Sequence, residues 1–430
     1  MQHAKHTKPG RVRIRTASCC GRLEWSAGGW ILQGPTKRVL SKRRKRFTEE
    51  PHMSALAKHH HPWRWVVLGV LAGLLITLCG CRELAYYAQA VRGEHQILSH
   101  RKPIGELIED PQTPEKLKRQ LVLVQKLRSF AGEELKLPID SRYLKYVDLQ
   151  RPYVVWNVQA APPFSLQPRT WWYPLVGSLD YRGYFTEAGA RACAERVQAD
   201  GDEVYVDGIE AYSTLGWFKD PILNTFVYHS EPELAEVIFH ELGHARVFAS
   251  GDTDFNEAYA TEVGQEGARR WLVAEGKTSL LVRYEASLRR EQQFVRLVQK
   301  TRSQLEAVYG DTLDEDGNIQ AASEPPAGAA ELLSKKQEIL GQLRQNYAKL
   351  KAEWNGDGVY DEWFTNDLNN AQLNTIANYY DYLPAFERLL WLNGGDLERF
   401  YGAVQRLADM PKSDGRRWLR ELSKGSSATP

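Results

Sequence analysis

The sequence is poor in cysteine, which limits how the chain can be cross-linked. Only five of its 430 residues are cysteine, and four of them lie within the first 81 residues. Cys193 stands alone in the remainder, which excludes an intramolecular disulfide in that part of the chain. Because Cys193 falls in a helical run over residues 186–199, we expect it to be a small, buried hydrophobic residue.

Long hydrophobic runs are also scarce, and the clearest one is short. Residues 65–80 carry no charge, but this run is shorter than the roughly 20 residues that a membrane-spanning helix needs. Met53, Lys58 and Arg64 precede it, so the pattern predicts a secretion signal over residues 53–80. A short apolar helix that anchors an uncleaved chain is the alternative interpretation.

The end of this signal carries a further motif, Leu78-Cys79-Gly80-Cys81, which resembles the bacterial lipobox. The resemblance implies cleavage before Cys81, lipidation of its sulfur and its new amino group, and stable attachment to a membrane. Arg82 in the next position implies the outer membrane rather than the inner one. We therefore expect a lipid-anchored protein of the bacterial cell envelope that faces the periplasm.

The net charge of +2 hides an uneven distribution. Residues 1–52 carry 13 Lys and Arg against 3 Asp and Glu, and residues 53–80 add two more basic residues, which leaves −10 for residues 81–430. The basic excess thus precedes the signal, and we expect no nucleic-acid partner. We interpret residues 1–52 as the result of a start codon assigned too far upstream, so that translation begins at Met53. A real cytosolic basic extension is the alternative.

Histidine is infrequent as well, yet two of the five histidines after residue 80 are four residues apart. His240 and His244 lie on one face of a helix predicted by a capping box at Ser230 and Glu233 and by an apolar face that includes Leu242. Two imidazoles at this spacing can bind one zinc ion, with Glu241 within reach of its water. The alternative is a helix with two surface histidines.

A third ligand is expected from the next helix, which begins near Phe255 after a short loop. Glu257 lies in its first turn and is the predicted ligand, although Asp254 is an alternative. Three protein ligands would leave one position for water, as in catalytic zinc sites. A carboxylate should also orient one of the histidines. The candidates for that role are Asp252, Asp254, Glu262 and Glu266.

The motif HExxH followed by NExxA resembles the gluzincin metallopeptidases. Residues 181–185, 211–218, 239–244 and 255–261 together resemble a bacterial lipoprotein family called putative aminopeptidases, over residues 81 to about 405. The resemblance implies a mixed sheet beside the HExxH helix, with an edge strand that binds the substrate backbone. It also implies a tyrosine from a later helix facing the zinc, for which Tyr379 is our first choice and Tyr382 our second. Structural packing is the alternative for both tyrosines.

The predicted fold class is α+β, with a zincin-like catalytic core and a mainly helical part that contains a long antiparallel hairpin. Strands are expected at residues 153–158, 171–176 and 204–206, and the hairpin helices at 278–309 and 330–354. The loop between them, 311–328, is expected to be a flexible tip. The predicted regions are an upstream extension (1–52), the signal (53–80), a helical region (81–140), the catalytic region (141–275), the hairpin (276–356), a C-terminal helical region (357–422) and a disordered tail (423–430).

The predicted function is hydrolysis of peptide bonds by zinc-activated water, with Glu241 as general base. The family resemblance implies an aminopeptidase, but no Gly-x-Met-Glu-Asn segment for binding the substrate's amino terminus is present. Two alternatives therefore remain open. One is an endopeptidase or amidase acting on the cell wall or on envelope proteins, and the other is a non-catalytic binding lipoprotein with a structural zinc.

Overall fold

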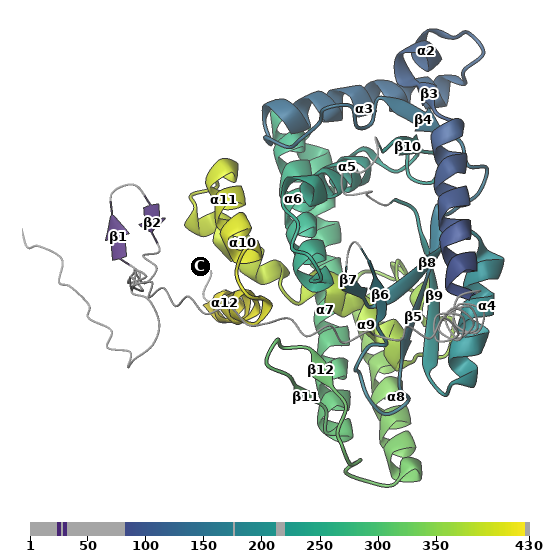
Figure 1. Cartoon of the computed structure of the whole chain (residues 1–430). Helices are drawn as coiled ribbons and strands as arrows, with labels where there is room; N and C mark the ends of the chain where they lie inside the picture. The colour runs from purple at the N-terminus through teal and green to yellow at the C-terminus, as the bar shows by residue number, and fades with distance from the viewer. Residues whose placement is uncertain (1–23, 27–28, 32–81, 175–176, 212–219, 426–430) are drawn as a thin grey trace, which may run out of the picture. The chain divides into compact units, whose positions relative to one another are not determined.

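The computed structural model describes residues 24–26, 29–31, 82–174, 177–211 and 220–425 (Figure 1). The chain divides into two compact units, residues 1–70 and 71–430. In the first unit, β1 (Glu24–Ser26) and β2 (Gly29–Ile31) pair as an antiparallel hairpin. The predicted signal and Cys81 lie outside the described residues. No helix in the described part of the chain is both long and apolar enough to cross a membrane.

The second unit begins with a helix over residues 82–99 and a small sheet. In this sheet β4 (Lys145–Val147) pairs antiparallel with β3 (Lys102–Pro103) and parallel with β10 (Ile222–Leu223). Two helices lie between β3 and β4 in the sequence: α2 (Ile104–Glu109) and α3 (Glu115–Glu133). The break between them coincides with the prolines at 111 and 114.

A second sheet has the strand order β8-β5-β9, and both pairs are antiparallel. Its strands and the helix that packs on it are β5 (Val155–Ala161), β8 (Tyr181–Tyr184), β9 (Glu203–Ile209) and α4 (Glu187–Ala199). Side chains alternate along β5: Trp156, Val158 and Ala160 form a core with α4. The opposite face, which includes Asn157, borders a cavity described below.

The two helices of the predicted metal site, α5 (Glu231–Arg246) and α6 (Thr253–Ala274), pack closely against each other. They contribute many side chains to the main hydrophobic core, which α3 also joins. The next two helices, α7 (Thr278–Tyr309) and α8 (Ala329–Glu353), pack along each other and build a second core. This second core also contains Leu166 and Leu373, so the helix pair is joined to the rest of the unit.

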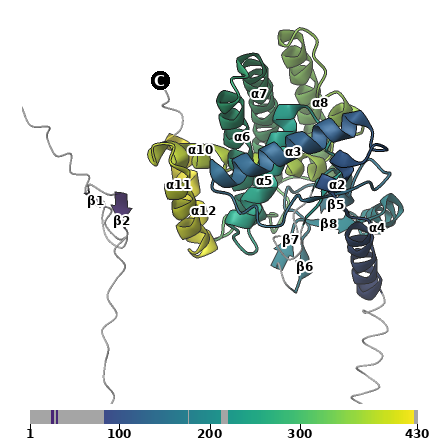
Figure 2. The ribbon, with the colours of Figure 1, turned by 90° about the horizontal axis from the view of Figure 1, so that it is seen from above.

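The C-terminal part is helical and lies beside α6. After the short 3-10 helix η1 (Glu362–Phe364), four helices follow: α9 (Asn370–Tyr380), α10 (Leu383–Leu392), α11 (Leu397–Ala408) and α12 (Lys412–Gly425). Helix α9 packs against α6, α7, β5 and β9, whereas α10 packs against α6 and α12. Figure 2 shows α10, α11 and α12 grouped on one side of the unit.

The mixed α+β class is confirmed, but several details of the prediction are wrong. The expected strand 171–176 is only β6 (Trp171–Tyr173), which pairs with β7 (Gly177–Leu179) in a separate hairpin. The mixed sheet is the small one containing β4, whereas the sheet of β5 is wholly antiparallel. Helix α12 extends to Gly425, three residues into the expected tail.

The loop between α7 and α8 also differs from the expected flexible tip. It contains a two-stranded hairpin of β11 (Thr312–Leu313) and β12 (Ile319–Gln320). Side chains hold this loop to the rest of the unit, because the Asp311 carboxylate accepts hydrogen bonds from Ser165 and from the backbone N–H of Leu166. Sequence composition does not reveal such contacts, since their partners lie far away in the chain.

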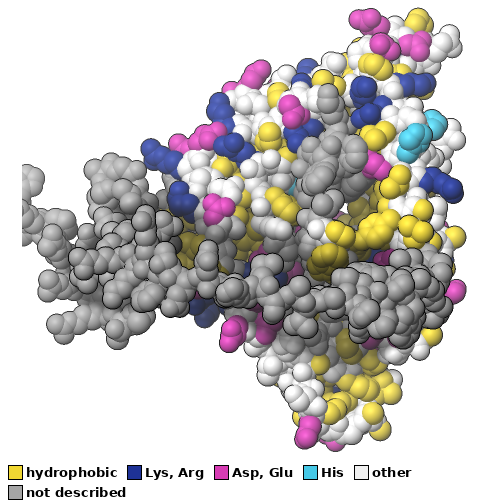
Figure 3. Space-filling model, viewed as in Figure 1, with side chains coloured by type: hydrophobic (Ala, Val, Ile, Leu, Met, Phe, Trp, Pro, Cys, Tyr) yellow, Lys and Arg dark blue, Asp and Glu magenta, His cyan; other side chains and the backbone are white. Residues whose placement is uncertain are grey.

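The surface carries charges of both signs. On the face seen in Figure 3, Lys and Arg side chains are interspersed with Asp and Glu over the elements at the top of the view, where α3 lies. Among the described side chains of this face, no broad patch of basic residues stands out.

Candidate metal centre

Helix α5 presents the two histidines because its start and its buried face are both well defined. The backbone N–H of Ser230 donates to the Glu233 carboxylate at 3.1 Å, as the predicted capping box requires. Leu234, Ile238 and Leu242 are fully buried and fix the helix against the main core. His240 and His244 therefore point from one face of a firmly packed helix.

Glu257 of α6 completes a group of three ligand atoms. The Nε2 atoms of His240 and His244 are 3.1 Å apart, and Oε2 of Glu257 lies 3.4 Å and 3.5 Å from them. A tetrahedral zinc ion with ligands at 2.0–2.1 Å would separate them by about 3.3–3.4 Å. The three side chains therefore fit one zinc ion. Within the described residues, no fourth His, Cys, Asp or Glu joins this group.

The alternative third ligand, Asp254, is engaged elsewhere. Its carboxylate accepts a hydrogen bond from Nη2 of Arg416 at 2.9 Å, and Asp252 also binds the same guanidinium group. Both acids thus connect the loop between α5 and α6 to α12. The structure brings Glu257, and not Asp254, to the two histidines.

The charges of the three ligands balance one another in a buried setting. Burial alone would raise the pKa of Glu257, but His244 and His240 lower it well below its usual range, so the carboxylate is ionised. Burial lowers the pKa of His240, which favours the neutral imidazole that a metal requires. Burial also opposes protonation of His244, but the Glu257 carboxylate outweighs it and raises the His244 pKa.

Glu241 lies beside the three ligands without joining them. Burial is the main cause that raises the pKa of Glu241 to about 8. The nearby His244 opposes this shift, whereas the carboxylates of Glu257 and Asp220 add to it. Its Oε2 atom is buried and has no hydrogen-bond partner in the described part of the chain. A metal ion held next to it would lower this pKa and favour the carboxylate.

These four side chains border a cavity of about 410 Å³ between the helices and the sheet. The sheet contributes the side chains of one face, including Asn157 of β5, Tyr181 of β8 and Asp207 of β9. The helix of residues 82–99 contributes Tyr86 to the same cavity. Among the described residues that line it, none is Lys or Arg.

The loop between the two site helices is closed by a residue to which the sequence assigned no role. The side-chain amide of Asn256 donates to the backbone carbonyl of Ala249 at 2.7 Å and accepts from the Ala249 N–H at 2.8 Å. These two buried hydrogen bonds fix the start of α6 and thereby the position of Glu257. In the Asn-Glu pair of the motif, Asn256 therefore positions the residue after it, the candidate ligand Glu257.

The carboxylates expected to orient a histidine are otherwise occupied. Asp252 and Asp254 bind Arg416, and Glu266 binds the guanidinium groups of Arg270 and Arg269. Glu262 is buried, and burial raises its pKa well above the usual range. Nδ1 of His244 has no hydrogen-bond partner among the described side chains. The predicted orienting carboxylate is therefore not seen at His244.

Of the two tyrosines predicted to face the zinc, only Tyr382 has a described side chain, and it does not line the cavity of the two histidines. The side chain of Tyr379 lies outside the described part of the structure. Its neighbour Tyr380 donates to Glu291 at 2.6 Å, and Tyr382 lies beside Arg416 in a separate cavity. Tyr181 instead lines the cavity that the two histidines and Glu257 border. Burial is the main cause that raises the pKa of Tyr181 above its usual range, and the charge of Glu257 adds to the shift. Sequence reasoning assigned Tyr181 no role.

The outer edge of β8 is bonded to side chains, which bears on the predicted binding of a substrate strand. Gln89 accepts from the backbone N–H of Phe185 at 3.0 Å and donates to the carbonyl of Gly183 at 3.5 Å. Tyr173 donates to the carbonyl of Tyr181 at 3.3 Å. A substrate strand could pair with this edge only by displacing these bonds. The sequence also offers residues 212–226 as an edge strand or a loop lining the cleft, with ordinary core packing as the alternative, and residues 212–219 of this segment lie outside the described residues.

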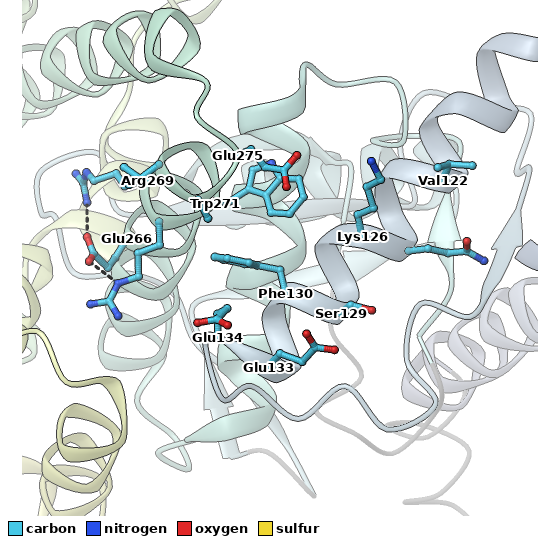
Figure 4. A pocket seen from close by; sticks show the side chains of 14 residues that line it. Val122, Lys126, Ser129, Phe130, Glu133, Glu134, Glu266, Arg269, Trp271 and Glu275 are labelled. Carbon is cyan, nitrogen blue, oxygen red and sulfur yellow. Dashed lines mark hydrogen bonds and ion pairs between the residues drawn. The ribbon is translucent and has the colours of Figure 1, made fainter.

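A larger and more open groove of about 1050 Å³ lies between α3 and α6 (Figure 4). Phe130 and Trp271 form part of its wall, and Glu266 pairs there with Arg269 and Arg270. It contains none of the candidate metal ligands, nor Glu241, so size alone does not identify the functional cavity.

Comparison with known proteins agrees with the family suggested by the motifs. The sequence model of a family described as putative aminopeptidase matches residues 85–419, which include both site helices and the sheet. No curated protein and no solved structure matches the chain.

Proposed function

Because the chain belongs to the putative aminopeptidase family, we propose that it is a zinc-dependent peptidase with a gluzincin-like site formed by His240, His244 and Glu257. The observation that carries this proposal is the triangle of ligand atoms, whose sides of 3.1–3.5 Å suit one tetrahedral ion. Three protein ligands rather than four favour a catalytic role over a structural one, because a catalytic ion keeps a position for water.

Each neighbouring side chain has a distinct task in peptide hydrolysis. A bound zinc ion would supply Lewis acidity, which activates water and polarises the scissile carbonyl. Glu241 accepts the proton of the attacking water and passes it to the leaving amine, a role that suits its free Oε2 atom. Tyr181 donates a hydrogen bond to the oxyanion that develops on the substrate carbonyl, the role predicted for Tyr379, whose side chain is not described.

The variant Glu241→Gln tests the role of the general base. The change preserves shape and hydrogen bonding but removes the proton acceptor, so hydrolysis of unstructured peptides should fall by at least about 100-fold. Zinc content should stay the same, because Glu241 is not one of the ligands. Glu285→Gln, a change at an acid outside the cavity that pairs with Arg269, is the matched control. Unchanged hydrolysis by Glu241→Gln would remove this residue from the mechanism.

We also propose that the mature protein is anchored in the outer membrane through lipid on Cys81 and faces the periplasm. The proposal rests on the charge-free run and the sequence Leu78-Cys79-Gly80-Cys81. Cys81→Ala should move the protein from the membrane fraction to the soluble fraction of the producing cells. Membrane fractionation that survives this change in salt-washed membranes would contradict lipidation.

A further inference from the structure

We propose that Asp207 binds the free ammonium group at the amino terminus of the peptide substrate. Asp207 lies on β9 and lines the same cavity as the metal ligands. The inference rests on the proposed peptidase function and extends it, because it states which end of a peptide enters the cavity and which side chain holds that end.

The first argument is the charge balance of the cavity. The described part of its lining contains four acids, Asp207, Glu241, Asp252 and Glu257, and neither Lys nor Arg. Arg416 neutralises Asp252, because its Nε lies 3.1 Å from each of the two carboxylate oxygens. Glu241 and Glu257 together match the two positive charges of a zinc ion. Among the described lining carboxylates, Asp207 is then the one without a compensating cation, and no salt bridge joins it to another described residue.

The second argument is the placement of Asp207 on the sheet. It lies directly opposite Asn157 in the register of β5 and β9, and Asn157 lies opposite Gly183 of β8. Side chains at paired positions share a face, so Asp207 and Asn157 stand next to each other on the floor of the cavity. A Cβ at Gly183 would approach Oδ1 of Asn157 to 3.2 Å, so glycine keeps this floor open. The Asn157 amide oxygen can accept a second hydrogen bond from the same ammonium group.

The electrostatic surroundings of Asp207 favour the binding of a cation beside its carboxylate. Burial raises its pKa, a backbone hydrogen bond from Gly208 opposes the shift, and the carboxylates of Glu210 and Glu362 add to it. An ammonium ion placed beside the carboxylate would offset the cost of burial and of these like charges. A neutral group, such as an acetylated amino terminus or an internal peptide bond, would not.

The remaining lining indicates the kind of side chain that enters with the ammonium group. Much of it is apolar or aromatic, with Val155, Leu179, Phe185 and Ile209 together with Tyr86 and Tyr173. Such walls favour an apolar first residue, since a charged side chain would lose its hydration there without gaining a partner. The preferred substrates are thus peptides with a free amino terminus and an apolar or aromatic first residue.

The first test compares two forms of one peptide with the full-length wild-type protein. The probe is Leu-Ala-Ala-Phe-Ala amide, with its amino terminus either free or acetylated, and the products are identified by mass spectrometry. The kcat/KM for the free form should be at least about tenfold higher, since a hydrogen-bonded charge in a desolvated site is worth that factor or more. In peptides lengthened at the carboxyl end, cleavage should stay at the same distance from the amino terminus.

The second test assigns this preference to Asp207. Asp207→Asn keeps the shape of the side chain, so it should lose at least about tenfold in kcat/KM on the free peptide and nothing on the acetylated one. Zinc content should not change. Asp200→Asn is the matched control, because Asp200 pairs with Arg169 at 3.1 Å on the surface and does not line the cavity.

The outcomes separate the two proposals. Equal cleavage of the free and acetylated peptides by the wild-type protein would overturn amine binding and leave the peptidase function standing. A free-form preference that Asp207→Asn retains would overturn the assignment to Asp207. Failure to cleave either form with zinc bound would refute the peptidase function itself, and the inference would fall with it.

Discussion

At the scale of single residues, the proposed metal centre depends on ionised and neutral groups that stabilise one another. Glu257 is largely buried, yet its pKa is held below the usual range because burial is outweighed by His244 and His240. Two imidazoles and a carboxylate removed from water would be costly in a purely structural cluster. Their convergence on one point is therefore better explained by an ion than by packing.

Tyr181 provides a prediction at this scale. Tyr181→Phe removes only the hydroxyl group that we assign to the oxyanion, so kcat should fall by about 100-fold while KM and zinc content stay near the wild-type values. Steady-state kinetics on a peptide with a free amino terminus provides the measurement. Tyr205→Phe, on β9 but outside the cavity lining, is the matched control. A fall in zinc content with kcat per bound zinc unchanged would show that Tyr181 only supports the fold.

Some residues of the candidate site could be predicted from the sequence, and others could not. His240 and His244 could be found because helix periodicity alone places residues i and i+4 on one face. Glu257 followed because a short loop brings the next helix back beside the first. Tyr181 and Asp207 could not be found in this way, because strands β8 and β9 reach the cavity only through pairing with β5. Their only local signal is alternation along a strand, which does not say what faces them.

At the scale of elements, the position of the third ligand depends on the C-terminal helix α12. Arg416 is 4% exposed and connects α12 to Asp252 and Asp254 at the start of α6. Its Nη1 also donates to Asn318 in the loop of the β11-β12 hairpin at 3.0 Å. One guanidinium group therefore fixes three elements that are distant in the sequence.

Removing this group should be costly. Arg416→Met leaves the buried Asp252 and the partly buried Asp254 without their cation, so the free energy of unfolding should fall by about 3 kcal/mol. The matched change Arg417→Met breaks an exposed pair with Asp414, whose side chains are 54% and 43% exposed, and should cost less than about 1 kcal/mol. Urea unfolding of both variants gives the comparison. Equal losses would show that Arg416 is no more than a surface contact.

At the scale of the whole molecule, the second unit is organised around two cores with the candidate site on the first. The main core contains the buried faces of α3, α5 and α6, and the second core lies between α7 and α8. The apolar spacing along both long helices predicted that they would pair. It did not predict that Leu166 and Leu373 would join their core, because that contact depends on chain segments far apart in the sequence.

The account depends most directly on the presence of zinc at the three ligands. We would measure the zinc content of the purified protein from residue 82 onward, beside the variant Glu257→Ala and the control Glu266→Ala on the same helix. The account predicts one zinc ion per chain in the wild type and the control, and loss of zinc in Glu257→Ala. A folded wild-type protein that binds no zinc, or a Glu257→Ala variant that keeps it fully, would contradict the proposed metal centre.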